Sequence, residues 1–189
     1  MTDLKPDIDA CIETLNKGGI ILYPTDTIWG IGCDATNPQA VEKVYQLKQR
    51  NDNKALIVLL GDEDQLSHYV VDVPEMAYNL LEVAVDPLTI IYEGAYNVAP
   101  NLLGDNDSLG IRIPHETFTQ KLCRQFKKPI VSTSANISGE PAAQNYRDID
   151  PRIIEQVDYV CWSRRQEHKP HQPSAIIKLG PDGEVKVIR

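Results

Sequence analysis

Residues 23–50, YPTDTIWGIGCDATNPQAVEKVYQLKQR, contain the pattern from which the rest of the fold can be worked out. The apolar run at residues 20–23 has the length of a buried strand. Pro24 ends this strand because proline has no N–H to donate to a sheet ladder. Three short polar side chains follow at residues 25–27, so the strand ends in a polar segment.

A turn and a helix are expected after the polar segment. Gly30 and Gly32 favour a tight turn, or the close approach of another group, because glycine has no Cβ. Asn37 and Pro38 are typical of the cap and the first residue of a helix. The residues at the spacing of one helical face are Val41, Val44 and Tyr45.

The end of this helix carries two cations, Lys48 and Arg50. Residues two apart point to opposite sides of a helix but to the same side of an extended segment. The cations can hold one anion together only if the helix stops near Lys48, and residues 51–53 favour such a stop because they form turns well. Spacing alone favours a simpler interpretation, a solvated basic helix end stabilised by the helix dipole.

Composition and charge describe a globular chain of 189 residues, long enough for one domain with a sizeable core. No apolar run has membrane-spanning length and residues 1–10 do not resemble a secretory signal, so we expect a cytoplasmic protein without membrane association. The four cysteines form no CxxC pair, which predicts reduced core thiols rather than a metal site. The net charge of −8 argues against a general nucleic-acid binder.

Strand and helix patterns alternate along the chain. Strands are expected at residues 20–23, 55–60, 87–92, 108–113, 128–132, 159–162, 174–179 and 184–188. Helices are expected at residues 6–16, 38–48, 62–69, 74–84, 117–126 and 150–157. This alternation predicts a single α/β domain over residues 1–189. The last two strands are joined by the turn sequence GPDG, which makes the predicted sheet mixed rather than purely parallel.

Two segments without periodicity are candidate lids, and the sequence does not rank them. The first is GAYNVAPNLLGDND at residues 94–107, and the second is the charged loop SRRQEHKPHQP at residues 163–173. Long loops in compact domains are often functional and otherwise merely mobile. His168 and His171 fall in the second loop, where we expect solvated side chains rather than metal ligands.

Small polar or cationic side chains gather at four predicted element ends. These ends lie at residues 25–27, 48–50, 108–112 and 132–136. Ligands of open α/β sheets bind at strand ends, so we expect one common cleft. The groups are hydroxyls, an amide and three cations without an obvious His/Asp or Cys/His pair, which suits anion clamping better than nucleophilic catalysis. Arg112 is the candidate for a bidentate grip on a carboxylate or phosphate, with Lys48 as a point charge.

Each of these groups also has a purely structural explanation. Residues 132–138 are compatible with a turn that satisfies its own backbone. Alternation places Arg112 on the face of its strand opposite the core set, where it is compatible with a surface position. No P-loop or GxGxxG pattern is present, so a nucleotide would be held without either motif. The residues alone therefore predict an α/β domain with an anion-binding cleft.

Five motifs in order resemble the YrdC-like family, the threonylcarbamoyl-AMP synthases. The family pattern reads YPT-x-T-x-x-G-x-G, K-x-R, R-x-P, S-x-N-x-SG and S-x-I-I/V. This chain has YPTDTIWGIG from residue 23, KQR from 48, RIP from 112, SANISG from 134 and SAII from 174. Each motif alone is weak, but together they extend the resemblance over residues 18–189.

The resemblance implies a twisted mixed β-sheet flanked by helices, with a large concave cleft. The chain resembles the short, single-domain type without a C-terminal extension domain. The implied reaction joins L-threonine, bicarbonate or CO2, and ATP into threonylcarbamoyl-adenylate and pyrophosphate. A separate transferase complex then modifies a tRNA adenosine beside the anticodon, and weak RNA binding by the synthase itself is left open. Mg2+ would arrive with ATP, and no dedicated metal site is implied.

The resemblance also implies roles for individual residues. The catalytic and phosphate-binding residues would be Lys48, Arg50, Ser134 and Asn136, with Ser108 and Arg189 as lesser ATP ligands. The threonine ligands would be Thr25, Arg112, Ser132 and Ser174, with Arg112 on the carboxylate. Lys48 and Arg50 are expected to be exposed cleft residues whose loss leaves the fold intact.

The chain departs from the family pattern in places that bear on the cleft floor and on nucleotide affinity. Asn51 replaces a proline, Ala55 replaces the proline of a Pro-Leu pair, and Asp86 replaces a glycine. One rival function is a catalytically silent relative that binds RNA or nucleotide, but that branch lacks the K-x-R and S-x-N groups present here. The other is the carbamoyl-transfer module of hydrogenase-maturation proteins, whose usual zinc-finger and acylphosphatase parts are missing.

Overall fold

The computed structural model describes residues 3–49, 56–167 and 173–189. Its strands are β1 (Ile21–Tyr23), β2 (Gly30–Gly32), β3 (Ile57–Leu59), β4 (Leu88–Tyr92), β5 (Leu109–Arg112), β6 (Ile130–Ser134), β7 (Tyr159–Val160), β8 (Ala175–Leu179) and β9 (Val185–Val187). Its α-helices are α1 (Lys5–Asn16), α2 (Pro38–Leu47), α3 (Glu75–Val83), α4 (Thr117–Phe126) and α5 (Pro151–Ile154). Short 3-10 helices lie at Glu63–His68, Pro100–Leu102, Asp105–Asp107 and Tyr146–Asp148.

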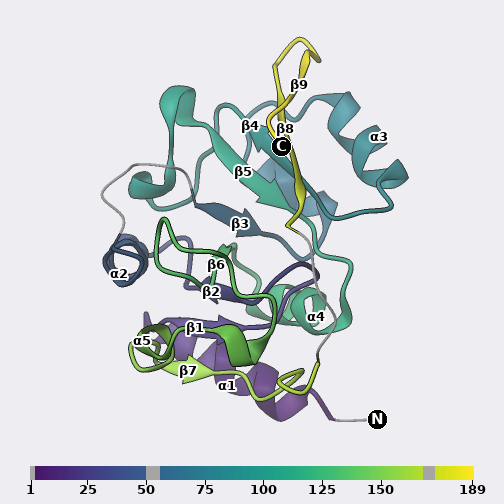
Figure 1. Ribbon diagram of the computed structural model, residues 1–189. Coiled ribbons are helices and arrows are strands. Elements are labelled where there is room, and N and C mark those ends of the chain that lie inside the picture. Colours follow the sequence, from purple (N-terminus) through teal and green to yellow (C-terminus); the bar gives the residue numbers. More distant parts are fainter. Residues whose placement is uncertain (1–2, 50–55, 168–172) are drawn as a thin grey trace.

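The strands form one mixed sheet in the order β7-β1-β2-β6-β3-β5-β4-β8-β9, which runs from bottom to top in Figure 1. The pairs β1–β7, β3–β5 and β4–β8 are parallel, and the other pairs are antiparallel. The predicted mixed α/β sheet is therefore confirmed. The predicted C-terminal hairpin is also present, with Ile177 opposite Val187 at the sheet edge.

Helices cover the sheet at both of its ends. α1 and α4 pack against each other beside β1 and β7, while α3 lies at the other end near β4 (Figure 1). α1 buries its predicted apolar face, which includes Ile8, Cys11 and Leu15. All four cysteines are free and buried, as the sequence predicts. No helix among the described residues has both the length and the apolar character that a membrane crossing requires.

The structure confirms the predicted boundaries of α2, and these boundaries position the site. The Asn37 side chain caps the helix by accepting hydrogen bonds from the backbone N–H groups of Gln39 and Ala40, at 3.0 and 3.1 Å. The helix ends at Leu47, and Lys48 is its C-cap. Gln49 then has a left-handed φ of 51°, which stops further helix formation. The cation at position 48 therefore stands at a helix end rather than on a helix face.

Of the two alternatives for Gly30 and Gly32, the tight turn is wrong, because both glycines belong to β2. The turn lies before them, and β2 pairs with β1 and β6. The close approach that glycine permits is nevertheless present at Gly32. A Cβ there would lie 2.6 Å from the Val131 carbonyl oxygen and 2.7 Å from the Tyr23 ring.

Gly32→Ala should therefore lower the free energy of unfolding by about 1–3 kcal/mol, the usual cost of overpacking. Gly30→Ala is the matched control in the same strand, because its nearest neighbours would be 3.4–3.5 Å from the new Cβ. Urea unfolding of both variants measures the difference. Equal midpoints for the two variants would contradict this account of β2.

The two candidate lids differ in their relation to the sheet. Residues 94–107 are packed rather than loose, since Ala95, Ala99 and Leu102 are buried and two short 3-10 helices interrupt the segment. In the second candidate, residues 168–172 lie outside the described part of the chain. The helix expected at residues 150–157 is only one turn long, because α5 ends at Ile154.

Candidate active site

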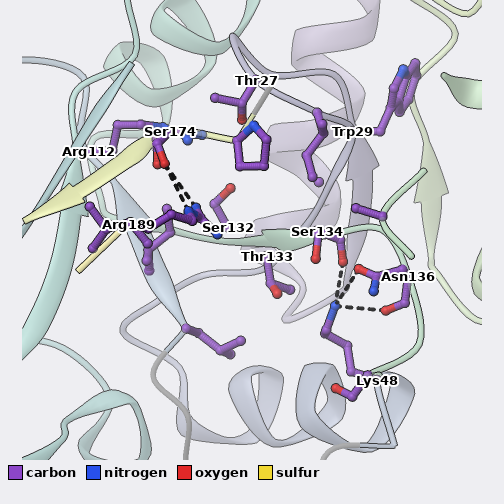
Figure 2. Close-up of a pocket in the computed structure, with 18 of the residues that line it drawn as sticks. Thr27, Trp29, Lys48, Arg112, Ser132, Thr133, Ser134, Asn136, Ser174 and Arg189 are labelled. Atoms are coloured by element: carbon purple, nitrogen blue, oxygen red, sulfur yellow. Dashed lines mark hydrogen bonds between the residues drawn. The ribbon is translucent and has the colours of Figure 1, made fainter. Parts of the chain in front are cut away.

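A cleft lies beside the strands in the middle of the sheet (Figure 2). Its volume of about 410 Å3 is in the usual range for small-molecule sites. The segment after β1, the end of α2, the end of β5, β6 and the start of β8 all contribute to it. The predicted site residues that line it are Lys48, Arg112, Ser132, Ser134, Asn136, Ser174 and Arg189. Groups far apart in the sequence thus meet at one place.

Lys48 holds the segment that follows β6. Its ammonium group donates hydrogen bonds to the carbonyl oxygens of Ser134 and Asn136, at 2.6 and 2.8 Å, and contacts Asn136 Oδ1 at 3.4 Å (Figure 2). The Asn136 amide in turn donates to the carbonyl oxygen of Glu140 at 2.6 Å. Lys48 is only 3% exposed, so the expectation of an exposed cleft residue is wrong. Its side chain lies beneath a turn whose carbonyl oxygens solvate the charge.

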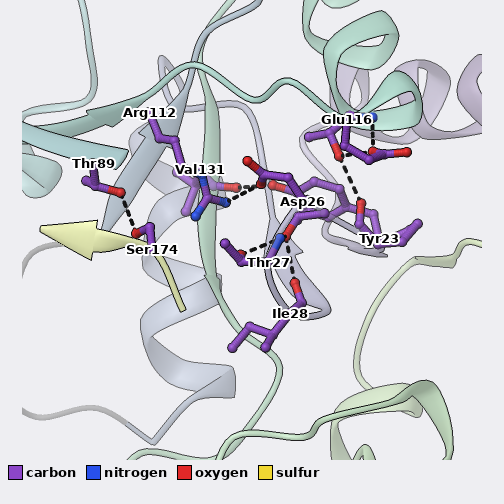
Figure 3. Close-up of polar contacts among 12 residues, drawn as sticks. Tyr23, Asp26, Thr27, Ile28, Thr89, Arg112, Glu116, Val131 and Ser174 are labelled. Atoms are coloured by element: carbon purple, nitrogen blue, oxygen red, sulfur yellow. Dashed lines mark hydrogen bonds and ion pairs between the residues drawn. The ribbon is translucent and has the colours of Figure 1, made fainter. Parts of the chain in front are cut away.

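Arg112 is also buried, with 3% of its surface exposed, so the alternative of a surface position on β5 is wrong, and the side chain lines the cleft. All four residues of β5 are buried. Arg112 Nη2 lies 3.2 Å from Asp26 Oδ1 (Figure 3). Burial raises the pKa of the Asp26 carboxyl group, and the Arg112 charge partly offsets this rise. The sequence analysis missed Asp26, although it is the one charged residue in the polar segment 25–27.

Hydroxyl groups lie around Arg112. Ser132 is buried and lines the cleft. The hydroxyl oxygens of Ser174 and Thr89 lie 2.8 Å apart in a hydrogen bond (Figure 3). Arg189 donates to the Ser174 carbonyl oxygen at 3.1 and 3.3 Å, which brings a further cation to this side of the cleft.

The two threonines of the polar segment have different positions. The Thr25 hydroxyl donates to the Ile28 carbonyl oxygen at 2.7 Å and accepts from the Thr27 backbone N–H at 3.1 Å. Thr25 is 2% exposed and does not line the cleft, whereas Thr27 does. The residue expected to bind threonine, Thr25, is thus a turn residue outside the described cleft lining, whereas its neighbour Thr27 is part of that lining. Both belong to the same motif, so the motif alone could not distinguish them.

A further candidate, Ser108, is not brought into the described part of the cleft lining. Ser108 immediately precedes β5, whereas Arg112 ends it, and Ser108 is not among the described residues that line the cleft. Arg50 lies outside the described residues, as do Asn51 and Ala55. Asp86 is exposed beside the start of β4 and does not line the cleft.

The cleft has the chemical character of an anion clamp. Its described lining contains three cations, Lys48, Arg112 and Arg189, together with hydroxyls and one amide, and it includes no histidine, cysteine or carboxylate. Asp26 is not part of the described lining, but it forms an ion pair with Arg112, which is. Mg2+ prefers carboxylate and phosphate oxygens. The described lining offers no carboxylate side chain, so a Mg2+ ion would have to enter the cleft bound to phosphate groups.

The comparison with known proteins identifies the family. The Sua5/YciO/YrdC family model, which carries the description telomere recombination, matches residues 13–189. The chain belongs to the Sua5/YciO/YrdC family. Threonylcarbamoyl-AMP synthase from Xanthomonas campestris pv. campestris strain B100 is 34% identical over 159 residues, covering 82% of this chain and 84% of the relative.

Solved structures of the Sua5/YciO/YrdC family share the fold. Escherichia coli YciO superposes with a TM-score of 0.85 at 26% identity, over all of this chain and 90% of YciO. Sua5 of P. abyssi, solved in complex with L-threonine, superposes with a TM-score of 0.82 at 23% identity, over 95% of this chain. This chain spans about half of that Sua5 structure, 52% of its length.

Proposed function

We propose that this protein forms threonylcarbamoyl-AMP and pyrophosphate from L-threonine, bicarbonate or CO2, and ATP. One observation carries the proposal. One cleft contains all of these groups, with Arg112 and Ser174 on one side and Lys48 and the 134–136 segment on the other (Figure 2). The first group suits an amino-acid carboxylate and hydroxyl, and the second suits phosphate oxygens.

The reaction needs one bond to form and one to break at phosphorus. The threonine amine and bicarbonate first give a carbamate and water. A carbamate oxygen then attacks the α-phosphorus of ATP, the bond from that phosphorus to the bridging oxygen breaks, and pyrophosphate leaves with its Mg2+. The charge that develops on the phosphate oxygens must be met by donors already in place.

The residues divide this work between the two ends of the cleft. Arg112 would bind the threonine carboxylate, while Thr27, Ser132 and Ser174 supply hydroxyl groups around it. At the other end, Lys48 holds the 134–136 segment so that Ser134 and Asn136 face the phosphates.

Arg50 would add positive charge for the nucleotide, and Arg189 would add it from the Ser174 side of the cleft. Ser108 has no role in this arrangement, because it lies outside the described cleft lining. Bringing three reactants together in one cleft would supply much of the acceleration.

Isotope labelling tests this proposal. The purified protein, incubated with MgATP, L-threonine and carbon-13 bicarbonate, should yield a threonylcarbamoyl-adenylate whose mass includes the label. Omission of threonine should abolish this product. Formation of AMP without a labelled adenylate would show ATP hydrolysis and would contradict the proposal.

The product would be used by a separate complex that transfers the threonylcarbamoyl group to tRNA. We place this activity in the cytoplasm, where ATP and tRNA meet. The silent RNA-binding alternative has less support, because the chain has a net charge of −8 and its cleft is small enough to suit a nucleotide and an amino acid. RNA binding driven by phosphates would weaken steeply as salt is raised.

A further inference from the structure

The buried pair of Asp26 and Arg112 has unsatisfied polar atoms. The two side chains are 8% and 4% exposed, and their ion pair of 3.2 Å joins Oδ1 to Nη2. Among the residues that the structure describes, both Asp26 carboxylate oxygens and Arg112 Nε lack a hydrogen-bond partner. Buried polar atoms in this state are rare in native proteins and call for an explanation.

Stability of the fold does not explain this pair. Taking two charges out of water costs several kcal/mol per ion, and the attraction repays that cost only when further hydrogen bonds satisfy the remaining atoms. The unsatisfied atoms show that this condition is not met here. Such a pair is better explained by a task that requires a fixed guanidinium.

The arrangement of the pair indicates that task. Arg112 lines the cleft, whereas Asp26 does not, so the carboxylate holds the guanidinium from the side away from the cleft (Figure 3). A guanidinium binds a carboxylate with two parallel hydrogen bonds only when its plane is correctly oriented. The Asp26 carboxylate attracts Nη2 from this side and so favours one orientation of that plane.

We propose that Asp26 is a positioning residue that orients the Arg112 guanidinium for bidentate binding of the L-threonine carboxylate. This inference rests on the proposed function. It differs from a model in which Asp26 competes with the substrate for Arg112, because the two models predict opposite changes in threonine affinity when the Asp26 charge is removed.

The test is Asp26→Asn, which keeps the side-chain shape and removes the charge. We expect the KM for threonine to rise about tenfold, because a misoriented guanidinium loses part of its hydrogen bonding to the charged carboxylate. The kcat and the KM for ATP should stay within about threefold of the parent, since the phosphate end of the cleft is unchanged. Asp26→Glu restores the charge and should recover part of the threonine affinity.

Two further variants separate positioning from a general structural effect. Asp34→Asn is the matched control, because Asp34 is a buried aspartate 2.7 Å from Lys128 Nζ and outside the cleft lining. It should leave the threonine KM unchanged. In an Arg112→Lys background, Asp26→Asn should raise the threonine KM by less than about twofold more, because the planar group that Asp26 orients is gone.

A binding measurement makes the result independent of turnover. The chain has two tryptophans, and Trp29 lines the cleft, so Trp162→Phe leaves Trp29 as the only tryptophan reporter. When threonine binding is followed by the fluorescence of Trp29, Asp26→Asn should bind threonine about tenfold more weakly than the parent.

A threonine affinity in Asp26→Asn that is unchanged, or tighter than the parent's, would overturn the inference. If the parent enzyme shows no threonine-dependent pyrophosphate release, the proposed function has failed rather than the positioning role alone.

Discussion

Lys48→Ala is expected to reduce threonine- and bicarbonate-dependent pyrophosphate release by about 100-fold or more, which corresponds to about 2.7 kcal/mol of transition-state stabilisation. The Lys48 ammonium holds the Ser134 and Asn136 carbonyl oxygens at 2.6 and 2.8 Å, so its loss removes a charge and releases the segment that we propose to face the phosphates. Hydrogen bonds to a charged group contribute about 1.5–3 kcal/mol each. Pyrophosphate release at saturating substrate measures the effect.

The same substitution should also lower stability, because Lys48 is buried rather than exposed. Circular dichroism at the assay temperature checks that the variant is folded. Lys43→Ala is the matched control, since Lys43 is on the helix that ends just before Lys48 and its hydrogen bond goes to the Gly18 carbonyl oxygen at 3.2 Å, outside the described cleft lining. Its activity should stay near that of the parent. A folded Lys48→Ala protein with activity within threefold of the parent would contradict the assignment of Lys48 to the phosphate end.

Arg112→Ala should raise the threonine KM by about 100-fold, because the proposed bidentate contact of the guanidinium with the threonine carboxylate is lost. The variant should also be less stable by about 3–5 kcal/mol near neutral pH, since Asp26 remains as a buried charge without its partner. Threonine dependence of pyrophosphate release measures the first effect, and denaturant unfolding measures the second.

The loss of stability should depend on pH in a defined direction. Burial raises the folded-state pKa of Asp26, and removing Arg112 raises it further. A carboxyl group with a raised folded-state pKa binds its proton more tightly in the native state, so stability falls as pH rises from the unfolded pKa of about 3.9 through the folded value. The difference in unfolding free energy between parent and variant should therefore shrink as the pH is lowered toward about 4.

Arg124→Ala provides the control for Arg112→Ala. Arg124 pairs with Asp62 on the surface, where the two side chains are 51% and 42% exposed. Exposed pairs contribute about 0–1 kcal/mol, and this pair lies outside the cleft lining, so stability and threonine KM should change little. An unchanged threonine KM in Arg112→Ala would show that Arg112 binds something other than the threonine carboxylate.

Local sequence signals predicted the parts of the fold that depend on local chemistry. Asn37 accepts the hydrogen bonds of a helix cap, and the helix that it starts ends just before Lys48. The strand at Leu88–Tyr92 and the C-terminal hairpin follow from apolar runs and turn residues. These features depend on backbone propensities and side-chain periodicity within a few residues.

The parts that failed depend on contacts between distant segments. Alternation along β5 placed Arg112 on the face opposite the core set, where a surface position was one of the alternatives, but periodicity cannot show that this face is buried as well. The burial of Lys48 results from the turn after β6, and the pairing of Arg112 with Asp26 joins residues 86 positions apart. The assignment of Thr27 rather than Thr25 to the cleft likewise needed the path of the turn.

The most direct test of the central claim is pyrophosphate release by the purified protein with MgATP, measured with and without L-threonine and bicarbonate. We predict release that requires both, because the carbamate that attacks ATP is made from both. Release that is independent of threonine, or no release from the folded protein under any combination, would contradict the claim that this cleft joins an amino acid to a nucleotide.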